Sequence, residues 1–202
     1  MKNLLFTALL ATLLVSCNNA GGGSAPTVDA SGYILEDIPG SNLQRATMED
    51  ENGNLIEAGF LENGVKVGTW TIYKAGNEFP QKIISYVNGQ YTGPYLEFND
   101  RGQLELKAGY LNNKLHGSWG KYRFGRPEQT ANYVNGELDG TYKEYFTRDG
   151  KIQKEVNYKN GKEHGVMRYY NEAGEVTVEY QFENGEKVGG GILNPDTPNE
   201  PK

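Results

Sequence analysis

The feature that most restricts how this chain can fold is a six-residue element that recurs six times. It consists of Asn, then Gly or Asn, then three variable residues and a final Gly. Successive copies lie 25, 24, 23, 25 and 24 residues apart, and they begin at Asn63, Asn88, Asn112, Asn135, Asn160 and Asn184. A period of this length is typical of repeat proteins, in which each unit packs mainly on its neighbours.

Each repeat has the pattern of two strands and two turns. Asn-Gly pairs such as Asn88-Gly89 tolerate positive φ at both centres of a type I′ turn, which joins a strand to its antiparallel successor. The run from Leu104 to Tyr110 alternates apolar and polar residues, as a strand with one apolar face does. Because the repeats show no helical period, the sequence predicts an all-β fold, an elongated single-layer antiparallel β-meander built from repeated hairpins.

Some positions depart from the regular pattern. Upstream of the first element an earlier hairpin is predicted, which closes on either Phe60 or Leu61. Pro80 and Pro127 stand where turns inside repeats end, so we expect these hairpins to be lengthened or blunted. The sixth element runs into three Gly residues, 189–191, and we expect no strand after it, as in a truncated capping repeat.

Aromatic residues recur at fixed places in the repeats and define three columns. The first column follows the repeat Gly by two residues and contains Trp70, Tyr95, Trp119, Tyr142 and Met167. The second column comes three residues later and contains Tyr73, Phe98, Tyr122, Tyr145 and Tyr170. The third column closes the second strand of each repeat and contains Tyr86, Tyr110, Tyr133, Tyr158 and Phe182.

The first two columns are the candidate core and the candidate binding surface. A separation of three residues places them on opposite faces of a regular strand, and a single-layer sheet cannot cover both; a bulge that brings them together is the alternative. We expect the first column to point inward, because Trp is the largest apolar group available, and the third column to complete the core. The predicted partner-binding row is then the second column, Tyr73, Phe98, Tyr122, Tyr145 and Tyr170.

The repeats also resemble a known family. The runs G-T-W-T-I-Y, G-P-Y-L-E-F, G-S-W-G-K-Y, G-T-Y-K-E-Y and G-V-M-R-Y-Y, with the Asn-Gly elements between them, are similar to the MORN-repeat variant found in many bacterial proteins. The resemblance covers about residues 45–190. It implies a single-layer β-repeat scaffold, described as a protein-interaction or lipid-associated module, with some members called antitoxin-like. It implies no particular ligand.

The N-terminus has the pattern of an export signal. Lys2 is followed by an apolar stretch, residues 4–15, that is about 18 Å long as a helix and too short to span a ~30 Å hydrocarbon core. The next segment, Leu14-Val15-Ser16-Cys17, resembles the lipobox of bacterial lipoprotein precursors, in which the Cys becomes lipid-modified. Cys17 is the single Cys of the chain and can form no internal disulfide. Asn18 in place of Asp favours sorting to the outer membrane of a Gram-negative bacterium.

These signals divide the chain into four segments. Residues 1–16 are the predicted lipoprotein signal peptide, and residues 17–32, rich in Gly, Ser and Asn, are the lipidated Cys17 with a flexible tether. Residues 33–191 are the predicted MORN-variant repeat domain. Residues 192–202 contain three Pro and predict a disordered tail.

Charge and residue types argue against several function classes. A net charge of -6 disfavours binding of nucleic acid. His116 and His164 occupy the same repeat slot, roughly 19 Å apart at about 4.8 Å per strand, too far to share a zinc ion. They are interpreted as solvated turn residues, and the recurring Glu97 and Glu144 as a solvated stripe. The sequence therefore predicts no catalytic residue, no metal site and no cofactor.

The combined prediction is a lipid-anchored scaffold of the cell envelope, exported and non-catalytic, that binds an unidentified protein partner and reaches the membrane through its N-terminal lipid. Two alternatives stay open at this point. One is an immunity-like or antitoxin-like protein that neutralises a toxin. The other is a structural lipoprotein that contacts glycan or peptidoglycan through stacked aromatic rings. A hydrolase is the least favoured alternative, because no pocket chemistry is apparent.

Overall fold

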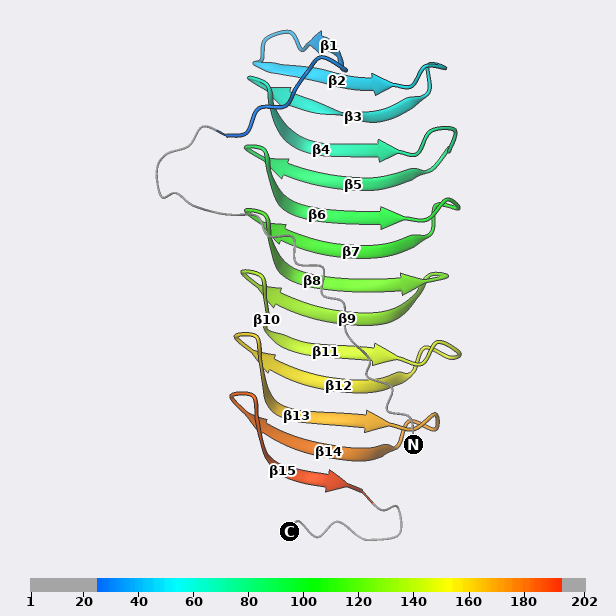
Figure 1. The fold of residues 1–202 in the computed structure, drawn as a ribbon, viewed down its shortest axis with the longest axis vertical. Helices are drawn as coiled ribbons and strands as arrows, with labels where there is room; N and C mark the ends of the chain where they lie inside the picture. The colour runs from blue at the N-terminus through cyan, green and yellow to red at the C-terminus, as the bar shows by residue number, and fades with distance from the viewer. Residues whose placement is uncertain (1–24, 194–202) are drawn as a thin grey trace, which may run out of the picture.

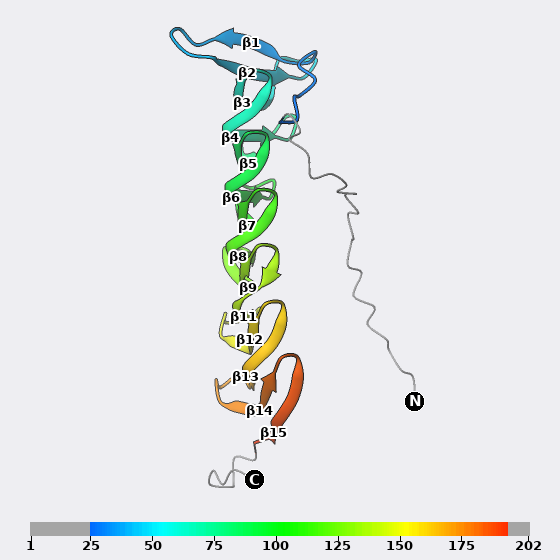
Figure 2. The ribbon, with the colours of Figure 1, turned by 90° about the vertical axis from the view of Figure 1, so that its left-hand side faces the viewer.

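The computed structural model describes residues 25–193, and these form a single antiparallel sheet. Its 15 strands follow one another in sequence order, apart from one short strand that pairs beside this path. The described elements are all strands, so none of them is a helix that could cross a membrane. Figures 1 and 2 show a long, narrow stack of hairpins with the chain descending from one end to the other. The predicted fold class, an elongated single-layer β-meander, is confirmed.

The strands are short and of similar length. The first seven are β1 (Ile34–Asp37), β2 (Leu43–Glu49), β3 (Leu55–Glu62), β4 (Val65–Tyr73), β5 (Pro80–Val87), β6 (Gln90–Phe98) and β7 (Leu104–Leu111). The remaining eight are β8 (Lys114–Arg123), β9 (Arg126–Val134), β10 (Glu137–Leu138), β11 (Gly140–Tyr145), β12 (Ile152–Lys159), β13 (Lys162–Tyr170), β14 (Val176–Glu183) and β15 (Glu186–Ile192).

The repeated Asn-Gly elements form the turns along one edge of the stack, on the left in Figure 1. Their first Asn residues all have left-handed backbone, with φ between 49° and 54°. From the second copy onward, each turn is hydrogen-bonded to the preceding repeat: Gly89 N–H donates to the Lys66 carbonyl at 2.9 Å, and Gly161 N–H donates to the Leu138 carbonyl at 2.8 Å. Because the same bond recurs from turn to turn, this edge sets a constant geometry for the repeats.

A bulge follows each of these turns and bends the strand. Between β5 and β6, for example, Tyr86 pairs with Tyr91 and Ile84 with Tyr95, so three residues of β6 lie opposite Ser85 alone. Gly93 in this bulge has a φ of 107°, which Gly adopts without strain. The repeat Gly is therefore required by the bend rather than by a ligand.

The first aromatic column lies on one face and forms the core, as the sequence predicts. Trp70 is 0% exposed, and its indole lies over Gly59, where any Cβ would overlap the ring. Across the sheet, large and small side chains alternate along one row, in the order Trp70, Ile84, Tyr95, Ala108, Trp119 and Ala131. This alternation lets a thin layer fill its own surface. Trp119 and Tyr142 are only half-buried, in contrast to Trp70.

The third column packs beside the first, so it belongs to the core as expected. Edge-to-face ring pairs join the two columns in successive repeats. The ring centroids of Trp70 and Tyr86 lie 6.4 Å apart, and those of Tyr95 and Tyr110 lie 5.6 Å apart. Of Phe60 and Leu61, it is Leu61 that closes the first hairpin in the position of the third column. Leu61 is 0% exposed and pairs with Lys66 as Tyr86 pairs with Tyr91.

Two local expectations differ from the structure, and a third is confirmed. The Gly run at 189–191 does not end the sheet, because it lies inside β15, whose backbone pairs with β14. The hairpin that contains Pro127 is not lengthened: Arg123 pairs with Arg126 across a two-residue turn, Phe124-Gly125. The hairpin before Pro80 does have a long turn, residues 74–79. Pro127 is tolerated because the register shifts beside it, which removes the need for its N–H.

The N-terminal boundary of the folded part also lies earlier than residue 33. Val28 packs against the cluster of Ala46, Leu61 and Trp70, and its N–H donates to the Gly64 carbonyl at 2.9 Å. Residues from Pro26 onward therefore belong to the folded part and not to a free linker. The predicted signal peptide, Cys17 and most of the predicted tail lie outside the described residues.

Candidate binding surface

The second aromatic column lies on the face opposite the core. In β8, Trp119 belongs to the core row, and the next residue, Gly120, therefore points to the other face. A Cβ on Gly120 would come within 2.8 Å of the Tyr122 hydroxyl, so the Tyr122 ring lies over this position. Gly120 pairs with Thr130, whose hydroxyl is hydrogen-bonded to the Tyr145 hydroxyl at 3.0 Å. Tyr122 and Tyr145 thus share this second face.

Tyr122 and Tyr145 line one hollow on β8, β9 and β11. Its volume is about 420 Å³, and its lining comprises Lys107, Ser118, Trp119, Tyr122, Thr130, Ala131, Asn132, Thr141, Lys143 and Tyr145. Two ammonium groups, several hydroxyls and one amide therefore surround two phenol rings. Lys143 lies 3.7 Å from Glu155, a separation at which the pair is weak and Lys143 can still meet a partner. We call this hollow the Tyr122–Tyr145 groove.

The other three members of the predicted row, Tyr73, Phe98 and Tyr170, do not line this groove. All five rings are half-buried, so none stands free in solvent as a regular strand would present it. The reason is a register shift at each of them, which sets the ring opposite an apolar residue: Pro80, Leu104, Pro127, Ile152 or Val176. The structure brings together two of the five predicted binding residues.

On the core face, carboxylates sit against the aromatic rings. The Tyr95 hydroxyl donates to Glu97, whose carboxylate also lies 3.0 Å from Lys82. The Tyr142 hydroxyl donates to Glu144 at 3.0 Å. The prediction of a solvated stripe is therefore wrong, because both carboxylates are half-buried and bonded to core tyrosines.

These contacts shift acid–base equilibria. Burial first, and then the hydrogen bond to its neighbouring carboxylate, raise the pKa of the Tyr95 phenol and of the Tyr142 phenol. Burial alone would raise the pKa of Glu97, but the bonds from Tyr95 and Lys82 outweigh it and lower that pKa below its usual value. Such shifts fit a structural network, since they hold tyrosines neutral and Glu97 charged.

The two histidines are half-buried rather than solvated. His116 lies directly before a repeat Gly, and its Nδ1 accepts a long bond of 3.5 Å from the Asn135 N–H. Thr92 and Asp139, in the same slot, accept the corresponding bonds at 3.1 Å. His164 Nδ1 is buried and has no hydrogen-bond partner among residues 25–193. Within that range no group of three His, Cys, Asp or Glu side chains could hold a metal ion.

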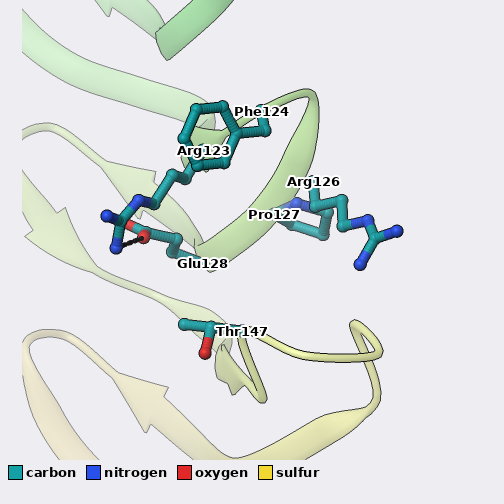
Figure 3. A pocket seen from close by; sticks show the side chains of 6 residues that line it. All are labelled: Arg123, Phe124, Arg126, Pro127, Glu128 and Thr147. Atoms are coloured by element: carbon teal, nitrogen blue, oxygen red, sulfur yellow. Dashed lines mark ion pairs between the residues drawn. The ribbon is translucent and has the colours of Figure 1, made fainter.

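A second hollow, which the sequence reasoning missed, adjoins the β8–β9 turn (Figure 3). Its volume is about 370 Å³, and it is lined by Arg123, Phe124, Arg126, Pro127, Glu128 and Thr147. Phe124 is 67% exposed. The signal in the sequence was Phe-Gly at the place where the other hairpins carry longer turns rich in Asn, Asp and Gly.

Comparison with known proteins adds little to this description. No family model matches the chain, and no curated protein matches it. Among solved structures, the chain is similar to a crystal structure of a mutant of S. aureus TarM in complex with fondaparinux, α-GlcNAc-glycerol and UDP. The TM-score is 0.28 at 11% identity, over 80% of this chain and 22% of that one, so the chain spans about a fifth of that protein's length. A likeness this low carries no argument about function.

Proposed function

We propose that this protein is a lipid-anchored repeat scaffold of the cell envelope that binds a protein partner and catalyses no reaction. The observation that carries the proposal is the Tyr122–Tyr145 groove, because it places two aromatic side chains and two cations on the face that the core does not use. Tyr is favoured at protein interfaces, since its ring buries much area at a small cost in side-chain entropy.

The groove is built on paired strands rather than on loops, which supports a binding role. β9 pairs with β8 on one side and with β11 on the other, and the Thr130–Tyr145 hydrogen bond joins β9 to β11 within the groove. Side chains held by both neighbours of a strand keep their positions without a partner, so little order must be gained on binding. The contacts are therefore preorganised for recognition.

The envelope address rests on the sequence. The lipobox-like segment ending in Cys17 and the resemblance of the repeats to the MORN variant support a scaffold held on a membrane. We expect Cys17→Ser to release the protein from the membrane fraction and to abolish its labelling by palmitate, because acyl chains contribute about 0.8 kcal/mol per buried CH₂. A wild-type protein that is unlabelled and soluble would contradict the anchor.

The binding role is tested by comparing members of the same aromatic column. After cross-linking in the envelope, we expect Tyr122→Ala and Tyr145→Ala to lose recovery of a specific partner, with roughly a 30-fold weaker Kd once that partner is purified. Tyr73→Ala and Tyr170→Ala are the matched controls, since they remove the same ring outside the groove. Equal recovery with all four variants would contradict the proposal.

A second candidate function, contact with a glycan, is favoured by the lining of the same groove. Ser118, Asn132 and Thr141 place hydroxyl and amide groups beside the two Tyr rings, a combination that can bond to sugar hydroxyls. Soluble peptidoglycan fragments should then quench the groove tyrosines and compete with any protein partner. A lack of saturable binding at millimolar fragment would leave the protein partner as the function.

A further inference from the structure

The β8–β9 turn is unusual in its backbone. Phe124 has a φ of 50° and Gly125 a φ of 75°, the left-handed pair that a two-residue type I′ turn requires. A left-handed backbone brings the Cβ of an L-residue close to the following carbonyl oxygen, and only Gly, Asn and Asp accept it readily. A bulky Phe in this conformation is therefore strained.

The chain itself provides the comparison. Seven other non-Gly residues between 25 and 193 have positive φ, and all seven are Asn: Asn63, Asn88, Asn112, Asn113, Asn135, Asn160 and Asn184. Phe124 is the exception, although the turns of the opposite edge show that Asn-Gly fits this geometry repeatedly. The choice of Phe is thus not explained by the turn.

Packing within the chain does not explain it either. Phe124 is 67% exposed, whereas Phe79, on the next turn but one along the same edge, is 46% exposed and covers Gly102. The contact that Phe124 does make is with the Arg123 guanidinium, 5.5 Å from the ring centroid. A strained backbone that holds an apolar ring in solvent points to a contact with another molecule.

The charges around this turn differ in sign from the whole chain. Five cations lie on or beside this turn and the neighbouring β11–β12 turn: Lys121, Arg123, Arg126, Arg148 and Lys151. Three carboxylates accompany them: Glu128, Asp149 and Glu172, the last of which forms an ion pair with Arg148. Arg126 takes part in none of the ion pairs found among residues 25–193, and it donates instead to the Arg148 carbonyl at 2.8 Å. Figure 3 shows Arg123 and Arg126 extending to opposite sides of the turn.

We propose that the Phe124 turn is a docking site for a short acidic segment of a protein partner, in which Phe124 meets an apolar side chain and Arg126 receives a carboxylate. The adjoining hollow of about 370 Å³, whose lining includes Pro127 and Thr147, accommodates one or two side chains. The hollow shares no lining residue with the Tyr122–Tyr145 groove, so it adds a second contact with its own chemistry.

Charge favours a peptide over an anionic membrane surface as the occupant. Glu128, Asp149 and Glu172 lie beside the cations, and the chain as a whole carries a charge of -6, so a broad anionic surface meets repulsion. A short flexible segment carries few negative charges, so it meets less of this repulsion than a membrane surface does. Planar pairing with a carboxylate is also the geometry to which a guanidinium is best suited.

The test uses the full chain and a library of short peptides that each carry two adjacent glutamates beside a Leu or Phe, with matched peptides in which the glutamates are glutamines. We expect the acidic set to bind at least about tenfold more tightly than the neutral set, and more weakly as salt rises. Phe124→Asn should weaken this binding at least about tenfold and raise Tm by about 2–4 °C, because Asn relieves the strain.

Two further variants separate the ring from the charge. Arg126→Gln should weaken acidic peptides alone, with Tm unchanged, and Phe79→Asn should leave peptide binding as it is. The proposal is overturned if acidic peptides do not bind, if Phe124→Asn binds them as wild type does, or if that substitution lowers Tm. Binding to phosphatidylglycerol vesicles without binding to peptides would also overturn it. Because Tyr122 and Tyr145 are untouched, failure here leaves the groove proposal standing, and the reverse holds.

Discussion

The N-terminal and C-terminal halves of the sheet share one motif but pack differently. In the N-terminal half, edge-to-face contacts join six rings into a continuous series, Tyr33, Trp70, Tyr86, Tyr91, Tyr110 and Tyr95. In the C-terminal half, the rings form separate pairs: Trp119 with Tyr133, Tyr142 with Tyr158, and Tyr180 with Phe182. Both clusters of buried residues lie in the N-terminal half.

One variable slot accounts for much of this difference. This slot is the third residue after the first Asn of each repeated element, and its side chain faces the third column. In the second repeat it is Tyr91, whose ring centroid lies 5.1 Å from that of Tyr86 and 5.5 Å from that of Tyr110. In the first repeat it is Lys66, whose Nζ lies 4.0 Å from the Trp70 ring centroid. Later repeats carry Leu115, Leu138, Glu163 and Lys187 in this slot. A repeat motif thus sets the backbone, while a single variable side chain decides how far the core extends.

The largest effect is expected where the two halves differ most in burial. Trp70→Ala should lower the free energy of unfolding by about 3–5 kcal/mol, because the indole is 0% exposed and its removal leaves a cavity over Gly59. Trp119→Ala should cost about half as much, since Trp119 is half-buried. Urea denaturation followed by circular dichroism measures both, and equal losses would refute the comparison.

A smaller effect is expected from the slot itself. Tyr91→Leu should cost about 1–3 kcal/mol, because each edge-to-face pair contributes roughly 0.5–1.5 kcal/mol beyond its buried area. The converse change, Leu138→Tyr, places a ring beside Tyr133 and should stabilise the C-terminal half by about 1 kcal/mol. Thermal denaturation of the two variants decides the matter; if Tyr91→Leu is neutral, the continuous series of rings contributes nothing.

The turns should not distinguish the two halves. Asn88 and Asn160 both have a φ of 50°, a conformation that Asn tolerates better than Ala because its short polar side chain can hydrogen-bond locally, so Asn88→Ala and Asn160→Ala should each cost about 1 kcal/mol. Similar losses in the two variants would locate the difference between the halves in side-chain packing. A loss confined to one of them would instead assign the difference to the turn edge.

The smallest effect concerns acid stability. The folded-state pKa of Glu97 lies below its ordinary value of 4.5, so its contribution is present above that pH and is lost as pH falls through the folded-state pKa. Glu97→Gln should therefore lower Tm slightly at pH 7, where the contribution is present, and flatten the decline of Tm below pH 4.5. Glu144→Gln is the matched variant in the C-terminal half; an unchanged pH profile for Glu97→Gln would show that its ion pair with Lys82 is not maintained.

Much of the candidate site was within reach of sequence reasoning, although not its extent. The three-residue offset between Trp119 and Tyr122 correctly separated the two faces, because side chains alternate along a strand. The prediction that five rings form an exposed row was wrong, because the rings are half-buried. The register shifts that bury them depend on pairing with the next strand. Phe124 was missed because a hairpin with Pro127 was expected to be blunted rather than tight.

What the sequence determined by itself is the order of strands and the position of the Asn-Gly turns. Both follow from local chemistry, because the turn preference of Asn-Gly and the alternation of apolar and polar residues along a strand each involve only a few neighbouring residues. Only the tertiary structure decided which rings form a continuous core, that Leu61 rather than Phe60 closes the first hairpin, and that Tyr122 and Tyr145 share a groove. These depend on side chains from strands that meet only when the sheet assembles, and no local pattern records how a bulge in one strand aligns the residues of the next.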